Sequence, residues 1–265
     1  MKLLYLLRKD ILESRKGMLI YALTLFMLML LPSILSMIFG GPSYSKLATY
    51  YKDFFISFLF VGGFIITSLS FREDMYGKST QHNWIMLPAS PLEKLSVKVI
   101  YSAILYPILL LLFISASSLI IEGLKAMIFG KHYLVFNPVQ PFYLKMILIY
   151  IVTQSIFLMG AAYFRKASFV KTILMSNLLS LVIGLISILV IRIIFNKYFD
   201  GMSVDSDLIV NNFEIRFSSP ESFDGIVEFK VFETVGKVLF WVFVAPFCWV
   251  VSYFRIREVQ ANDAV

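Results

Sequence analysis

The chain has 265 residues, of which 59% are hydrophobic and only 15% are charged. Soluble domains contain about 25% charged residues, and a soluble chain of this length could not remove so much apolar surface from water. The composition excludes an ordinary soluble globular protein and predicts an all-α polytopic membrane protein. The net charge of +7 lies beside apolar runs, so it indicates membrane topology rather than a nucleic-acid-binding patch.

Residues 2–16 have the pattern of an amphipathic helix. On a helical projection the apolar and charged side chains separate onto opposite faces: Leu4, Leu7 and Ile11 against Lys2, Lys9, Glu13 and Lys16. Such a segment lies along the membrane with its apolar face in the headgroup boundary. We therefore expect an N-terminal interfacial amphipathic helix, and the alternative is a cytoplasmic tail.

Six charge-free stretches follow, with 29, 18, 23, 19, 20 and 17 residues. About 20 residues cross a hydrocarbon core of ~30 Å, and basic residues at the ends of the shortest stretch can extend to the interfaces. The chain is therefore predicted to form a single transmembrane domain, 1–265, with six transmembrane helices. Their predicted bounds are about 18–40, 54–71, 98–121, 144–164, 170–193 and 237–255.

The basic residues near the ends of these stretches are unevenly distributed. With the N-terminus inside, the inner segments hold fourteen Lys and Arg residues, and the two shorter outer loops hold five. Basic residues favour the cytoplasmic side. We expect a multi-pass protein of the plasma (inner) membrane with both the N- and the C-terminus in the cytoplasm.

The segment 197–236 between the fifth and sixth spans differs in composition. It carries eight acidic and three basic residues, and Phe213–Phe217 and Val227–Val231 alternate apolar with charged residues. Alternation with a period of two is typical of half-buried strands. We expect a small extracytoplasmic β-element here.

Sequence signatures of catalysis are missing. The chain has no Walker A sequence, no H-E-x-x-H and no G-x-S-x-G. Its two histidines, His82 and His132, fall on opposite sides of the membrane in this topology. The six stretches hold no ionisable side chain, which disfavours both catalysis and ion-coupled transport. We expect no enzyme activity, no metal and no cofactor in this chain.

The inner connection between the second and third spans combines charges, aromatic residues and two prolines. Ser90 can cap a helix that has Pro91 at its first position and Glu93 in its first turn. The connection also carries, in order, Phe71, Glu73, Gly77, Leu87-Pro88 and Lys98. At these residues the chain resembles ABC-2 type transporter permeases, the membrane subunits of ABC exporters. It differs from the family pattern in having Asp74 after the glutamate and an arginine at position 72.

The resemblance implies a permease subunit that moves a substrate with ATP hydrolysed by a separate ABC ATPase subunit. ATP and Mg would then bind in that partner. The connection would be an ATPase-coupling loop, with the site residues Phe71, Glu73, Gly77, Leu87, Pro88, Pro91, Glu93 and Lys98. A second permease copy or a sister permease would complete the path. The alternative is a non-transporting accessory or immunity protein that acts through its extracytoplasmic segment.

Polar residues within the spans are candidates for the path or for helix contacts: Gln154, Ser176, Asn177 and Ser180. Buried amides and hydroxyls in lipid must find partners, and they often join helices. Gly184 extends the face of small residues on the fifth span, and Gly62-Gly63 forms such a face on the second span. We expect one of these two spans to contact the second permease.

Overall fold

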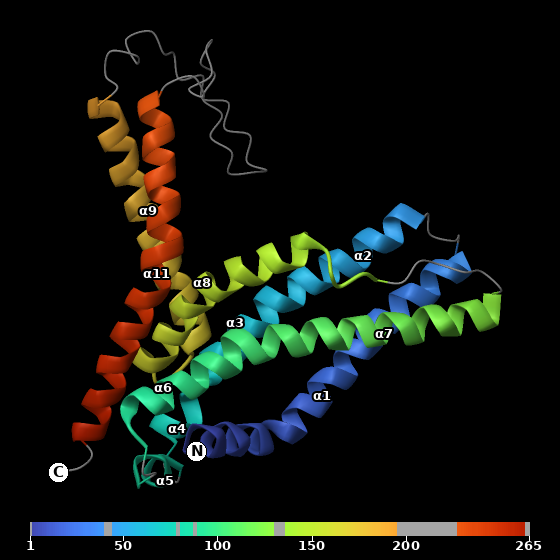
Figure 1. Ribbon diagram of the computed structural model, residues 1–265, viewed down its shortest axis with the longest axis horizontal. Coiled ribbons are helices and arrows are strands. Elements are labelled where there is room, and N and C mark those ends of the chain that lie inside the picture. The colour runs from blue at the N-terminus through green and yellow to red at the C-terminus, as the bar shows by residue number, and fades with distance from the viewer. Residues whose placement is uncertain are drawn as a thin grey trace. The chain divides into compact units, whose positions relative to one another are not determined.

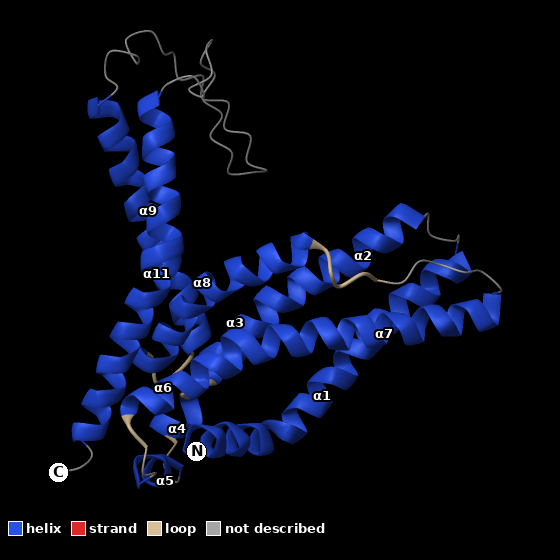
Figure 2. Ribbon diagram, in the orientation of Figure 1, coloured by secondary structure: helices blue, strands red, loops and turns tan. Residues whose placement is uncertain are grey.

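The computed structural model describes residues 2–39, 44–77, 80–86, 89–129, 136–194 and 227–262. These parts of the chain are helical apart from short connections, as Figure 2 shows, and contain no strand. Six of the described helices are long and apolar enough to cross a membrane: 14–35, 49–76, 91–128, 141–163, 168–187 and 238–260. The prediction of a polytopic helical membrane protein with six spans is confirmed at this level.

The first unit of the chain, Met1–Thr172 with Val244–Val265, holds most of the described elements. In chain order (Figure 1) they are α1 (Lys2–Phe39), α2 (Tyr44–Ser57), η1 (Phe58–Gly62), α3 (Gly63–Leu69), α4 (Arg72–Tyr76), α5 (Thr80–Met86), α6 (Pro91–Val99), η2 (Ile100–Leu105), α7 (Tyr106–Phe129) and α8 (Pro141–Tyr163). The start of α9 (Ser168–Ile194) and the last part of α11 (Val227–Asn262) complete it.

Helix α1 differs from the prediction of a separate interfacial helix. Residues 2–16 are not set apart from the first span, because α1 runs without a break from Lys2 to Phe39. Figure 1 shows that the helix bends along its course. The amphipathic pattern is therefore carried by the first turns of one long helix, and any position along the membrane stays a prediction.

Two π-helical turns, η1 and η2, interrupt the second and third long helices. Pro107 follows η2 by two residues, and a proline has no N–H for the carbonyl four residues earlier and crowds that carbonyl with its ring. A wider π turn directly before the proline accommodates this misfit. Such turns leave backbone carbonyls free for side chains of other helices.

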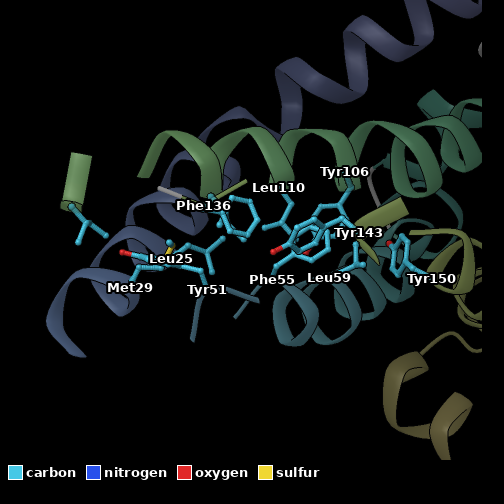
Figure 3. Close-up of a cluster of buried hydrophobic side chains, with 12 residues drawn as sticks. Leu25, Met29, Tyr51, Phe55, Leu59, Tyr106, Leu110, Phe136, Tyr143 and Tyr150 are labelled. Carbon is cyan, nitrogen blue, oxygen red and sulfur yellow. The ribbon is translucent and has the colours of Figure 1, made fainter. Parts of the chain in front are cut away.

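The larger cluster of buried side chains joins α1, α2, η1, α7 and α8, and Figure 3 shows its aromatic centre. Phe55 packs edge-on against Tyr143 with ring centroids 5.1 Å apart, and Phe136 lies 5.0 Å from the same tyrosine. Lipid is as apolar as these side chains, so close packing and hydrogen bonds, rather than expulsion from water, hold the helices together.

Two glycines of the second span let neighbouring helices approach closely. A Cβ placed on Gly62 would overlap the hydroxyls of Tyr21 and Tyr106, and one on Gly63 would overlap the ring of Tyr150. The small face of this span is therefore filled by α1, α7 and α8 of the same chain. The two glycines themselves are thus covered within the chain, and a contact of the second span with a second permease stays a prediction.

The second unit, Ile173–Phe243, contains most of α9 and the first turns of α11. Residues 227–231, predicted as a strand, form the start of helix α11, so this part of the β prediction is wrong. Helix formation there fits the long apolar run that follows from Val238, since a helix that enters lipid satisfies its own backbone groups. The other predicted strand, 213–217, lies outside the described residues.

Candidate functional site

The predicted coupling loop forms three short helices, α4, α5 and α6, beside the N-terminal turns of α1 (Figure 1). Lys98 at the end of α6 binds two carboxylates from distant parts of the chain. Its Nζ lies 2.8 Å from Oδ2 of Asp10 in α1 and 2.6 Å from Oδ2 of Asp74 in α4. The three side chains are only 12–15% exposed. This ion triad, defined as Asp10, Asp74 and Lys98, joins the loop to the first and third spans.

A second lysine of α6 fixes α5. Lys94 is 3% exposed, and its Nζ donates a hydrogen bond of 2.7 Å to the carbonyl oxygen of Trp84. The same Nζ lies 4.4 Å from the centroid of the Trp84 ring. A cation over a tryptophan face is attracted by the ring quadrupole. Two lysines one turn apart on α6 thus hold α1, α4 and α5 in place.

The start of α6 follows the sequence prediction closely. The side chain of Ser90 accepts a hydrogen bond of 3.2 Å from the Glu93 backbone N–H, and Glu93 Oε2 accepts one of 2.8 Å from the Ser90 N–H. Pro91 occupies the first turn, where its missing N–H costs nothing. This capping box satisfies two backbone donors and fixes where the loop turns into the third span.

The remaining loop residues named from the sequence take different places. Phe71 is completely buried, in a cluster with Trp84, Leu158 and Ile256. Gly77 directly follows α4. Glu73 lies in α4, but its side chain is outside the described residues, as are Leu87 and Pro88. Of the eight predicted residues, Lys98 and Glu93 make the polar contacts described above, and Phe71 anchors the loop by packing.

Two large apolar side chains of the loop face outward. Met86, the last residue of α5, is 79% exposed, and Leu92 in the first turn of α6 is 60% exposed. They flank the connection between α5 and α6. These are the two large apolar side chains that the described part of the loop leaves exposed.

The span interiors contain a polar network around the π-helical turns. Tyr106 donates a hydrogen bond of 2.6 Å to the carbonyl of Phe58 in η1, and Tyr150 donates one of 3.0 Å to the carbonyl of Ser102 in η2. Gln154 is fully buried, and its Nε2 donates to Ser102 Oγ at 2.6 Å. Gln154 is therefore a helix-contact residue between α8 and η2.

The polar residues predicted in the fifth span are placed differently from Gln154. Ser176 is half-buried, whereas Asn177 and Ser180 are exposed along α9. The fifth candidate span has 6% of its apolar window buried, against 50% in the fourth. These three residues belong to the second unit of the chain, whereas Gln154 belongs to the first.

The third span contains an ion pair that the sequence analysis did not predict. Helix α7 continues past residue 121, and Glu122 Oε1 lies 2.6 Å from Lys125 Nζ and accepts a hydrogen bond of 2.7 Å from the Tyr51 hydroxyl. Glu122 is 5% and Lys125 1% exposed. The candidate span runs to Ile128, so it extends beyond the predicted end at residue 121 and includes these two charges. The apolar run of residues 126–129 beyond the charges was the available signal.

No three His, Cys, Asp or Glu side chains among the described residues lie close enough together to hold a metal ion. Comparisons with models of protein families, with characterised proteins and with solved structures find no match to this chain. The functional interpretation therefore rests on the loop: its ion triad and its exposed apolar side chains.

Proposed function

We propose that the chain is the permease subunit of an ABC-2 type exporter, moving a substrate across the membrane with ATP hydrolysed by a separate ATPase subunit. Two independent features support this. The chain has six helices suited to cross a membrane. Its loop sequence resembles the coupling loop of that family from Phe71 to Lys98. In this proposal the chain has no catalytic site of its own, and ATP and Mg bind in the partner.

The observation that carries the proposal is a loop that ionic contacts tie to its neighbours and that also carries two exposed apolar side chains. The ion triad and the Lys94–Trp84 contact tie α4, α5 and α6 together. Met86 and Leu92 remain exposed. Movement of an ATPase subunit docked on these two side chains would be transmitted to α1 and α6 through the ion triad.

The triad also connects the loop to two spans, so that a movement of the loop would reach them. Asp10 belongs to α1, which continues as one helix into the first span, and Lys98 belongs to α6, which continues through η2 into the third. A partner that binds one loop position more tightly than another shifts the population of the states in which these spans differ. The loop, α1 and the third span would move together.

We also propose a second permease, as an identical copy or a sister chain, with the path between the two. Residues of α9 are available for this contact, because Asn177 and Ser180 are exposed and Gly184 lies one turn further on. Small and polar side chains allow helices in lipid to approach closely. In the second span, Gly62 and Gly63 are covered by tyrosines of the same chain, so α9 is the favoured candidate.

The docking surface is tested by placing charge on it. The variants Met86→Asp and Leu92→Asp should lose the Mg-dependent ATP hydrolysis that co-purifies with the wild-type protein from its native membrane. A charged carboxylate in the centre of an apolar contact is desolvated without a partner. The measurements are the ATPase rate and the partner stoichiometry of the purified complex.

Val139→Asp is the matched control. Val139 is 85% exposed on the connection between α7 and α8, so the same chemical change is made away from the loop. This variant should keep wild-type ATP hydrolysis, and all three variants should keep the wild-type unfolding temperature. Equal ATPase activity in all three, or none with the wild-type protein, would contradict the proposed function.

The proposed orientation places the loop and both termini in the cytoplasm of a cell with this protein in its plasma (inner) membrane. Single cysteines at His82 and at Val139, both exposed, test it after Cys248 is replaced by Ser. A membrane-impermeant thiol reagent applied to intact cells (with the outer membrane permeabilised, where there is one) should label position 139 and not position 82. The reverse pattern would invert the topology and remove the loop from reach of an ATPase.

A further inference from the structure

A hollow of about 370 Å³ opens beside the loop, within the first unit of the chain. Its polar lining comes from α4, α5, the α8–α9 connection and the last turns of α11: Tyr76, Gln81, Arg165, Lys166 and Arg255. Three of the lining side chains are cationic and none is acidic. Neither the ion triad nor the outward Met86 and Leu92 belong to it. The hollow is therefore positively charged, and the proposed transport function assigns no role to this charge.

The two arginines of the hollow rest on aromatic rings. The guanidinium carbon of Arg165 lies 5.6 Å from the centroid of Tyr76, and that of Arg255 lies 5.4 Å from Tyr163. A ring face holds a guanidinium without neutralising its charge. Arg255 does have one carboxylate, since its Nη1 lies 2.6 Å from Glu258 Oε2. Three cations against one carboxylate leave a net positive charge.

One donor in this group lacks a partner. The Nε of Arg255 is buried and makes no hydrogen bond of normal geometry within the described part of the chain, although the Tyr76 hydroxyl lies near this guanidinium. A buried donor without an acceptor costs free energy, and a phosphate oxygen is the acceptor for which a guanidinium is best suited. The chemistry of the lining thus points to an oxyanion.

The connection that carries Arg165 and Lys166 is short and held in shape. Helix α8 ends at Tyr163 and α9 begins at Ser168, so only four residues join them. Ala167 turns the chain with φ at 52°, a left-handed conformation that a non-glycine residue adopts only when its surroundings hold it there. The Ser168 hydroxyl donates a hydrogen bond of 2.6 Å to the carbonyl of Ser68. The two cations are therefore positioned before any ligand arrives.

The position of the hollow along the spans indicates where the oxyanion comes from. The candidate spans 141–163 and 168–187 stop and start on either side of this connection, and the span 238–260 ends just beyond Arg255. A connection between two consecutive spans lies where the hydrocarbon gives way to the lipid headgroups. Basic pockets between span ends at this depth meet lipid phosphates directly.

We propose that the hollow is a binding site for the phosphate of an anionic phospholipid headgroup, held by Arg165, Lys166 and Arg255. The choline of a zwitterionic lipid would bring a positive charge to the same three cations and is disfavoured. A free phosphate shares the recognised group but lacks the acyl chains that hold a headgroup at this depth. The site is independent of the proposed ATPase partner.

The test measures lipid binding to the purified full-length protein by native mass spectrometry and by its unfolding temperature. Phosphatidylglycerol should be retained and should raise the unfolding temperature, whereas phosphatidylcholine at the same concentration should not. The double variant Arg165→Gln/Lys166→Gln should bind phosphatidylglycerol about thirtyfold more weakly, because the loss of each interfacial cation weakens binding about fivefold. Lys166→Gln alone, on an exposed side chain, should show a smaller loss in the same direction.

Arg257→Gln is the matched control, since Arg257 is an exposed arginine two residues from Arg255 and does not line the hollow. It should bind phosphatidylglycerol like the wild-type protein. Equal binding in all variants would overturn the proposal, and so would inorganic phosphate that stabilises as strongly as the lipid. Loss of co-purifying ATPase activity with unchanged lipid binding would assign the hollow to the protein partner instead and overturn it as well.

Discussion

The first unit of this protein contains two buried ionic clusters built in different ways. In the ion triad, Lys98 binds Asp10 and Asp74. The three residues come from three helices, α6, α1 and α4. In the second cluster, Glu122 and Lys125 are one turn apart on the same helix, and Tyr51 joins them from α2. The first cluster has two carboxylates for one ammonium, whereas the second is balanced.

The difference between the clusters concerns what each can hold in place. A pair at i and i+3 forms on the surface of any helix and by itself stabilises little more than that helix. The triad exists only when α1, α4 and α6 are assembled, so its energy depends on their relative position. Removal of one partner also has unequal consequences, since it leaves two buried carboxylates in the triad and a single ammonium in the pair.

The largest effect is expected for Lys98→Met. Asp10 and Asp74 would then face each other as buried like charges, and breaking a buried ion pair costs about 3–5 kcal/mol. The apparent free energy of unfolding in detergent should fall by this order. The triple variant with Asp10→Asn and Asp74→Asn should recover most of the loss, because no charge stays unpaired. A single Lys98→Met variant as stable as the wild-type protein would show that the triad does not hold the loop.

A smaller effect is expected for Glu122→Gln. The amide oxygen can still accept the Tyr51 hydrogen bond, but Lys125 loses its charge partner. The expected loss is about 1.5–3 kcal/mol, the range for a hydrogen bond to a charged group. Thermal unfolding under the same conditions as for Lys98→Met gives a direct comparison. A loss larger than that of Lys98→Met would reverse the order of the two clusters.

The hydrogen bonds to the π-helical turns should contribute less than either ionic cluster. Tyr150→Phe removes the bond to the Ser102 carbonyl and keeps the ring, so the expected loss is about 0.6 kcal/mol, the average measured for such bonds between helices in lipid. Tyr163→Phe, on an exposed tyrosine at the end of the same helix, is the control for the chemical change. The unfolding temperatures of Tyr150→Phe and Tyr163→Phe should differ by less than the loss caused by Glu122→Gln. A larger difference would contradict this order.

The smallest and most local effect concerns the capping box of α6. Ser90→Ala should cost about 1 kcal/mol of local helix stability or less. Because Ser90 is exposed, the loss should appear as faster hydrogen exchange in the first turn of α6, with little change in global unfolding. Unchanged exchange at Glu93 and Lys94 would show that the triad alone fixes this helix.

The sequence resemblance led to the prediction of a coupling loop, but it did not predict how residues 71–98 are held in place. Ser90, Pro91 and Glu93 were predicted correctly because a capping box depends on residues three apart. Asp74 was noted as a departure from the family pattern, and the structure gives it Lys98 as a partner. No local pattern connects Asp74 or Asp10 to Lys98, since the three positions meet only after the helices pack.

The sequence by itself determined that this is a helical membrane protein with six spans, because the length of an apolar run must match the hydrocarbon thickness and every backbone group must be paired within it. It also determined the start of α6. The tertiary structure decided which side chains are buried together, from the triad to the tyrosines that fill Gly62 and Gly63. It also decided that α7 continues through Glu122 and Lys125. A charge-free stretch ends at the first charged residue, but a helix can continue past that residue where a buried partner such as Tyr51 binds the charge.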